Sequence, residues 1–277
     1  MDLVSVYITT CNRLEKLERA IKSVQNQTYS NVEIIVCDDA SSDGTELYMN
    51  NISENNSNII YIRSPIRKGA CYNRNQAISM AKGRFITGLD DDDEFEKNRI
   101  EFFVKNWNEK YSFICADFYD CYKNGTTTRH YDRGFEGDYK NLLIKNEASN
   151  QIFTLKERLE SIGGFDEDVK RLQDWDTWLR LSYKFGSFKR YNRALYLMHH
   201  DHEANEQRVS KSYSLKNALQ DFINRNKELY DTKSLKVMEF NISFESGRNS
   251  FVKSIVASIY SLNPRYILKS LIGKRKE

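Results

Sequence analysis

Hydrophobic and polar positions along the first hundred residues alternate between two periods. Short apolar or β-branched runs predict four strands, at residues 4–9, 32–36, 59–62 and 84–89. The segment between the first two runs instead carries apolar residues at helical spacing, at Leu14, Leu17, Ile21 and Val24. Strands that alternate with helices at this length predict βαβ units and a mostly parallel sheet, which is an α/β fold.

Further helices follow from the same spacing. Asn12, with Glu15 three positions later, predicts an N-cap for the first helix. A later helix begins near Asp174, because four residues share one helical face, at Trp175, Trp178, Leu179 and Ser182. From about Tyr213 the βα rhythm stops. We therefore expect one domain over residues 1–211, with halves at 1–95 and 96–211, and a helical C-terminal region over residues 212–277.

Acidic residues follow two of the predicted strands. Asp38 and Asp39 come after the second run, and Asp90 to Asp93 come after the fourth. In parallel sheets, ligands bind outside the carboxyl ends of the strands. Like charges about 6 Å apart repel by roughly 0.7 to 3 kcal/mol per pair, so we expect a counter-charge nearby. Aspartate oxygens suit Mg²⁺ or Mn²⁺, which bind carboxylates together with substrate phosphates. The structural alternative is that these acids cap the next helix.

Composition excludes several classes of protein. The chain has 277 residues and a net charge of only +3, which argues against a nucleic-acid partner. Five cysteines form no CxxC pair, which indicates free thiols. No N-terminal signal peptide and no apolar run long enough to span a bilayer are evident, so we expect a cytoplasmic protein.

Glycine-rich phosphate loops do not explain the acidic residues. Gly83 and Gly88 have the spacing of a P-loop, but Leu89 and Asp90 follow where lysine and serine or threonine are required. No GxGxxG motif occurs, which argues against a Rossmann dinucleotide site. If the sheet binds phosphates, a metal ion must neutralise much of their charge.

Several spaced motifs make this chain resemble the GT-A glycosyltransferases of family 2. The residues that carry the resemblance are Thr10-Cys11-Asn12-Arg13, Gln27-Thr28-Tyr29, residues 33–45, Tyr72-Asn73-Arg74-Asn75 and residues 81–93. The resemblance covers about three quarters of the chain and weakens beyond Ser210. It implies a Rossmann-like sheet flanked by helices, with a nucleotide-sugar-binding half at 1–95 and an acceptor-binding half at 96–211.

The resemblance also implies roles for residues at the nucleotide end of the site. Thr10, Arg13 and Asp39 are similar to positions that hold the nucleotide, with Asp39 accepting the ring N–H of uracil. Cys11 stands in the same motif, where an aromatic residue often stacks on the base. Arg74 is expected near the diphosphate.

The fourth-strand acids resemble a DxD-type element. Asp92 is expected to bind Mn²⁺ or Mg²⁺ directly. Asp90 and Asp91 are expected to reach the ribose or metal-bound water.

A second acidic motif, Gln173-Asp174-Trp175-Asp176, resembles the E-D-x-D segment that carries the catalytic base of inverting members. Asp174 matches the base, and Gln173 replaces a common glutamate. Such a carboxylate takes a proton from the acceptor hydroxyl while the metal stabilises the departing diphosphate. The structural alternative is a helix start in which Asp174 is a cap. Asp176 is expected to pair with Arg180 one turn later.

Histidines occur where related enzymes often have one near the metal. The sequence offers His199, His200 and His202, without zinc-site spacing. We expect His200 to be a metal ligand or a diphosphate contact. A solvated loop is the alternative.

The C-terminal segment is basic and amphipathic. Residues 246–276 contain no acidic residue and seven basic ones, Arg248, Lys253, Arg265, Lys269, Lys274, Arg275 and Lys276. One helical face is apolar, at Phe251, Ile255, Ile259 and Leu262. This pattern favours contact with an anionic membrane surface, to which each basic residue adds about 1 kcal/mol. Packing of this helix on the catalytic domain is the alternative.

Together these features predict an inverting, metal-dependent glycosyltransferase at the inner face of the cytoplasmic membrane. It would transfer a hexose or N-acetylhexosamine from a UDP-sugar to an undecaprenyl-diphosphate-linked saccharide during assembly of O-antigen or another surface polysaccharide, by analogy with the family. A metal-dependent phosphohydrolase or nucleotidyltransferase is a rival. However, the aspartate motif common in phosphatases follows the first strand, and the run at residues 4–9 leads into Thr10-Cys11-Asn12 instead. A non-catalytic module that binds nucleotide-sugars at membranes is the third hypothesis, and in it Asp174 would be dispensable.

Overall fold

The computed structural model describes residues 1–148, 151–201, 213–247 and 250–272. The chain forms two compact units. The first comprises Met1–Tyr139, Glu147–Asp168 and Gln173–Ala204, and the second comprises Lys140–Asn146, Val169–Leu172 and Asn205–Glu277. The domain boundary expected at residue 211 lies outside the described residues.

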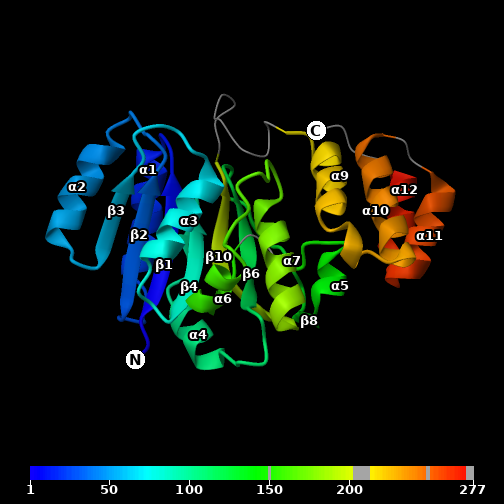
Figure 1. Cartoon of the computed structure of the whole chain (residues 1–277), viewed down its shortest axis with the longest axis horizontal. Helices are drawn as coiled ribbons and strands as arrows, with labels where there is room; N and C mark the ends of the chain where they lie inside the picture. Colours follow the sequence, from blue (N-terminus) through cyan, green and yellow to red (C-terminus); the bar gives the residue numbers. More distant parts are fainter. Residues whose placement is uncertain (149–150, 202–212, 248–249, 273–277) are drawn as a thin grey trace. The chain divides into compact units, whose positions relative to one another are not determined.

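The first unit is built on one sheet with the strand order β3-β2-β1-β4-β9-β6-β10-β5 (Figure 1). Its first four strands are parallel, namely β1 (Val4–Thr10), β2 (Val32–Asp38), β3 (Ile59–Arg63) and β4 (Phe85–Asp90). Antiparallel β9 (Phe153–Leu155) joins β4 to β6 (Ile114–Tyr122), which is parallel to β10 (Phe188–His200). Short antiparallel strands complete it, namely β5 (Glu94–Phe95), β7 (Thr127–Arg129) and β8 (Phe135–Gly137). The predicted mostly parallel sheet is confirmed.

Helices cover both faces of this sheet. In Figure 1, α1 (Leu14–Gln25) lies behind the strands and α3 (Ala70–Met80) lies in front of them. The remaining helices of the first unit are α2 (Thr45–Asn55), α4 (Arg99–Asn106), α6 (Lys156–Ser161) and α7 (Gln173–Phe185), and α5 (Tyr139–Leu142) begins at its last residue before the chain enters the second unit. Leu17 and Ile21 of α1 are buried with Val6 of β1, as their helical spacing predicts.

The start of α1 differs from the prediction. Asn12 does not cap the helix, because its backbone is left-handed (φ 55°) and Arg13 occupies the N-cap position. The Asn12 side chain instead accepts the backbone N–H of Ser42 at 2.7 Å. The backbone N–H of Leu14 lies in the first turn, where helical N–H groups have no acceptor within the helix. It donates to Asp43 Oδ2 at 3.1 Å, so a loop distant in sequence caps the helix. Local spacing alone does not reveal such a cap.

Within its described residues, the second unit contains four longer helices and a short 3₁₀ turn. The helices are α9 (Leu215–Arg225), α10 (Thr232–Glu245), α11 (Phe251–Ser261) and α12 (Arg265–Ile272). Val237 and Phe240 of α10 form a core with Ala257 and Tyr266. The helical C-terminal region predicted from the sequence is therefore present. Across the described residues, the helices are too short or too polar to cross a bilayer.

Candidate active site

The carboxyl ends of β1, β2 and β4 meet at one edge of the sheet. Thr10 is paired with Asp38 in the strand register, and Thr9 is paired with Asp90. The backbone N–H of Asp39 also donates to the Thr10 carbonyl at 2.9 Å. The two acidic segments singled out from the sequence are therefore neighbours in space, as parallel strands require.

Arginine supplies the counter-charge expected for the acidic turn. Arg13 Nη1 lies 2.9 Å from Asp91 Oδ1 and 3.1 Å from Asp92 Oδ2. Burial raises the pKa of Asp91 to about 7, against the lowering effect of Arg13, and the charge of Asp92 raises it further. The Asp91 carboxyl thus titrates near neutrality, although a guanidinium is in contact with it.

Asp93 is buried and connects the acidic turn to β10. Its carboxylate accepts the Tyr196 hydroxyl and the backbone N–H of His199, each at 2.8 Å. Burial, and then the charges of Asp92 and Asp90, raise the pKa of Asp93 well above its usual range. The sequence did not predict this contact of Tyr196, since only the position of β10 in the sheet brings Tyr196 close to Asp93.

Asp90 is held by two side chains from distant segments. Gln151 Nε2 donates to Asp90 Oδ1 at 2.9 Å, and Arg74 Nη2 lies 3.6 Å from the same oxygen. Gln151 is almost fully buried and also accepts the Tyr7 hydroxyl at 3.4 Å. Gly88 makes this arrangement possible, because a Cβ there would overlap both the Gln151 amide and the Tyr7 ring.

Arg74 connects the acidic turn to Asp174. Its Nη1 lies 3.5 Å from Asp174 Oδ1 and donates to Gln173 Oε1 at 3.0 Å, and its guanidinium lies 5.0 Å from the centre of the Phe165 ring. Burial raises the pKa of Asp174 to about 6, whereas Arg74 lowers it and Asp90 raises it. Asp174 Oδ1 is buried and has no hydrogen-bond partner among the described residues. Asp174 therefore lies beside the acidic turn and has the pKa of a base suited to neutral pH.

The rest of the Gln173-Asp174-Trp175-Asp176 motif is structural. Asp176 is buried and pairs with Arg180 at 2.9 Å, one helical turn later, as predicted. Trp175 and Trp178 are buried too, and Trp178 packs edge-on against Phe165 at 5.8 Å between ring centres. The buried face of α7 thus holds Asp174 in place.

Asp39 ties the end of β2 to the start of α3. Its carboxylate accepts the backbone N–H of Lys68 at 2.6 Å and of Gly69 at 3.0 Å, and Asn73 Nδ2 at 2.9 Å. The Cys11 thiol donates to the Asp39 carbonyl at 3.2 Å. Cys11 and Asp39 therefore lie together, as the sequence motifs imply, and their roles toward a nucleotide remain predictions.

The histidines occupy different positions. His200 Nε2 lies 2.7 Å from Asp120 Oδ1, and its ring stacks on Tyr122 at 4.8 Å. His199 Nε2 lies 2.8 Å from Glu94 Oε1. His202 lies outside the described residues. In the part of the chain that the structure describes, no hydrogen bond or ion pair joins His200 to Asp92, and the role of His200 at a metal remains a prediction.

The acidic turn fits a divalent cation only if a bound phosphate-containing ligand supplies additional oxygen donors. Among the described residues, no three histidine, cysteine or carboxylate side chains are arranged to hold a metal ion. The Asp92 carboxylate is 14% exposed and faces Arg13. Hard cations such as Mg²⁺ bind through one or two carboxylates plus substrate phosphates, so a donor set of this size is sufficient when phosphates are present.

Comparison with known proteins agrees with this geometry. The family model described as glycosyl transferase family 2 matches residues 5–163. Escherichia coli (strain K12) WcaA, provisionally named a colanic acid biosynthesis glycosyl transferase, is 33% identical over 87% of both chains. The GalNAc(5)-diNAcBac-PP-undecaprenol beta-1,3-glucosyltransferase of Campylobacter jejuni is 36% identical over 68% of this chain and 62% of its own length.

The fold agrees as well. The crystal structure of Staphylococcus aureus TarS 1-349 in complex with UDP-GlcNAc superposes with a TM-score of 0.65 at 14% identity, covering 97% of this chain and 90% of that one. The mostly parallel sheet with helices on both faces and an acidic turn at its carboxyl edge, together with these matches, identifies a GT-A fold. The chain belongs to glycosyl transferase family 2 and is a glycosyltransferase.

Replacing Arg13 with glutamine is expected to destabilise the protein more at pH 8 than at pH 5.5. Because the folded-state pKa of Asp91 is raised to about 7, its contribution to stability is complete below about pH 4 and is lost as pH rises through 7. Without Arg13 this pKa rises further, and a rise of about one unit gives an extra loss of about 1 kcal/mol at pH 8. Urea unfolding at both pH values measures the difference.

Arg84→Gln is the control, because the carboxylate partners of Arg84, Asp2 and Glu109, are exposed. Its small effect should be similar at the two pH values. A loss in Arg13→Gln that does not depend on pH would contradict the assigned role of Arg13.

Proposed function

We propose that this glycosyltransferase moves a hexose or N-acetylhexosamine, with inversion, from a UDP-sugar to a hydroxyl of an undecaprenyl-diphosphate-linked saccharide. The product would be a β-linkage in O-antigen or another surface polysaccharide. One observation carries the proposal: Arg74 bridges Asp90 of the acidic turn and Asp174, whose pKa is raised to about 6. A donor-binding carboxylate and a base are thus held at one edge of the sheet.

Relatives support the substrate class. The name of the Campylobacter jejuni relative describes β-1,3-glucosyl transfer to a saccharide on diphospho-undecaprenol, and WcaA is named for colanic acid biosynthesis. This chain spans less than two thirds of the Campylobacter protein, so we propose only the same class of acceptor for it, a lipid-linked saccharide. TarS 1-349 was crystallised in complex with UDP-GlcNAc, which favours a UDP-sugar donor here.

Each residue of the site has a proposed role. The donor-binding set comprises Thr10, Cys11, Arg13, Asp39, Arg74, Asp90 and Asp91. Asp39 would accept the uracil N–H through the carboxylate that now accepts the backbone N–H groups of Lys68 and Gly69, just before α3. Asp92 would hold Mn²⁺ or Mg²⁺ together with the diphosphate, with His200 as a further ligand. The metal, when bound, would stabilise negative charge on the departing diphosphate.

Asp174 would act as the general base. Its buried Oδ1, which has no hydrogen-bond partner among the described residues, would accept the proton of the acceptor hydroxyl as the hydroxyl oxygen attacks the anomeric carbon from the face opposite UDP. Arg74, fixed by Gln173 and Phe165, would keep this carboxylate oriented and partly ionised at neutral pH. Attack from the opposite face inverts the anomeric centre, which gives a β-linkage from an α-linked UDP-sugar.

Transfer should depend on Asp174 and Asp92 in different ways. With Mn²⁺, a panel of UDP-sugars and a synthetic GlcNAc-diphosphate-lipid acceptor, Asp174→Asn should lower kcat by about 10²- to 10⁴-fold while UDP-sugar binding persists. Asp92→Ala should weaken Mn²⁺-dependent UDP-sugar binding itself. Asp168→Asn, an exposed carboxylate in the loop before α7, is the control and should retain activity. Undiminished transfer in Asp174→Asn would favour a non-catalytic role for that residue and refute the assigned base.

The pH profile of the reaction should follow Asp174. Because the base must be deprotonated and its pKa is raised to about 6, kcat/KM should increase with pH through about 6 and then level off. Arg74 lowers this pKa, so Arg74→Met should move the acid limb to higher pH in addition to weakening donor binding. A limb near pH 4, or one that Arg74→Met leaves in place, would show that another group titrates.

The C-terminal helices are proposed to contact an anionic membrane, at the inner face of the cytoplasmic membrane, where a lipid-linked acceptor would lie. Leu262, between α11 and α12, is 91% exposed and adopts a left-handed backbone (φ 53°) that leucine rarely takes. Ile259 and Leu268 are also exposed, at 62% and 54%. Exposed apolar side chains with nearby basic residues fit anionic headgroups above an apolar interior.

Vesicle flotation should separate the apolar contribution to membrane binding from the electrostatic contribution. The full chain should float with vesicles containing phosphatidylglycerol but not with pure phosphatidylcholine, and a chain ending at Glu245 should do neither. Leu262→Gly removes the apolar side chain and relieves the backbone strain, so it should weaken flotation without lowering thermal stability. If the full chain ignores anionic vesicles as completely as the truncated one, the membrane proposal is wrong.

A further inference from the structure

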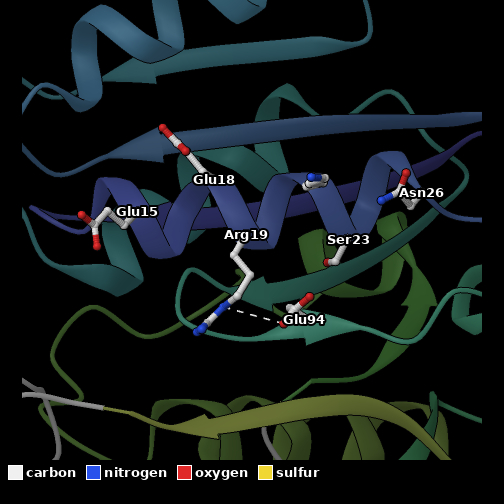
Figure 2. A pocket seen from close by; sticks show the side chains of 7 residues that line it. Glu15, Glu18, Arg19, Ser23, Asn26 and Glu94 are labelled. Carbon is white, nitrogen blue, oxygen red and sulfur yellow. Dashed lines mark ion pairs between the residues drawn. The ribbon is translucent and has the colours of Figure 1, made fainter. Parts of the chain in front are cut away.

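Arg19 lies in the second turn of α1, beside the acidic turn. It lines a groove of about 510 Å³. Figure 2 shows its guanidinium directed toward Glu94 of β5. The side chain is 29% exposed, so it is partly shielded from solvent. Neither the sequence motifs nor the proposed mechanism gives this residue a role.

The three nitrogens of the Arg19 guanidinium face three different segments. Nη2 donates to the backbone carbonyl of Asp92 at 2.5 Å, and Nη1 lies 2.8 Å from Asp201 Oδ2, just past the end of β10. Nε lies 3.8 Å from Glu94 Oε1, an oxygen that is also 2.8 Å from His199 Nε2. Arg19 therefore joins α1, the acidic turn and the end of β10.

These contacts complement those of Arg13. Arg13 binds the side chain of Asp92 at 3.1 Å, and Arg19 binds its main-chain carbonyl. Asp92 is thus held at both its carboxylate and its peptide group by two arginines from the start of α1. A planar guanidinium with five fixed donors can make such divergent contacts, whereas the point charge of lysine cannot reproduce them together.

Asp201 is fixed from the same helix. Lys16 Nζ, one turn before Arg19, lies 3.7 Å from Asp201 Oδ1. The end of β10, which carries His199 and His200, is therefore anchored to α1 through the Asp201 carboxylate.

We propose that Arg19 is a positioning residue for the donor site, one that sets the backbone of Asp92 and its alignment with the end of β10. This inference rests on the proposed role of Asp92 at the metal and diphosphate. Groups that orient a metal-binding side chain without touching the metal typically contribute about 10- to 100-fold to metal affinity or activity. Loss of Arg19 should therefore weaken binding of the donor more than it slows the chemical step.

The experiment compares Arg19→Gln and Arg19→Lys with Lys22→Gln, using the full chain. Lys22 lines the same groove one turn later, and among the described residues no hydrogen bond or ion pair joins its side chain to the acidic turn. Titration calorimetry measures the Kd of UDP at saturating Mn²⁺ and the Kd of Mn²⁺ at saturating UDP, and steady-state assays give KM and kcat. Thermal unfolding of the ligand-free proteins reports whether each variant is folded.

Both Arg19 variants should raise the two Kd values and KM by about 10-fold or more, with kcat changed by less than about 3-fold and unfolding midpoints near that of the parent. Lys22→Gln should match the parent. If Arg19→Gln fails to fold, Asp201→Asn, which removes one contact of Arg19, should still raise the Kd of UDP. Unchanged Kd values, or a fall in kcat alone, would overturn the proposal.

Asp92→Ala separates this inference from the proposed function. If Asp92→Ala weakens binding of UDP with Mn²⁺ but the Arg19 variants do not, only the positioning role is wrong. If Asp92→Ala has no effect, the metal role of Asp92 is wrong and the inference falls with it.

Discussion

Four consecutive carboxylates at the end of β4 repel one another, and the rest of the site is arranged around this constraint. Arg13 contacts Asp91 and Asp92, Arg19 reaches the Asp92 carbonyl, and Arg74 approaches Asp90. The arginines come from the start of α1 and from α3, on opposite faces of the sheet. Arg13 and Arg19 act on Asp91 and Asp92, and Arg74 acts on Asp90, so that the turn is neutralised from two sides.

Burial also affects carboxyl groups in this turn and beside it. It raises the pKa of Asp91 to about 7 and that of Asp174 to about 6, and it raises the pKa of Asp93 beyond its usual range. In the ligand-free protein, partial protonation therefore complements the arginines in reducing charge at this edge. A divalent cation bound with a nucleotide diphosphate would favour the ionised carboxylates again, which links metal binding to proton release.

The structure also changes the meaning of two sequence motifs. Asp39 is more than a turn residue, since it accepts two backbone N–H groups that precede α3 and so joins the end of β2 to the start of α3. His200 shares a carboxylate, Asp120, with His130, whose Nδ1 lies 3.0 Å from it. The contacts of both residues come from strands or loops far away in the sequence, and spacing along the chain does not encode them.

By itself, the sequence determined the parallel strand-helix alternation, the acidic strand ends and the buried face of α7, because each depends on hydrophobic periodicity or on residues adjacent in the chain. It also indicated the family through several motifs in a fixed order. Only the tertiary structure decided which cation meets which carboxylate, that Gln151 and Tyr196 support the acidic turn, and that Asp43 rather than Asn12 caps α1. Those pairings are set by strand register and helix packing, which bring together side chains as far apart in sequence as Arg19 and Asp201, separated by 182 positions.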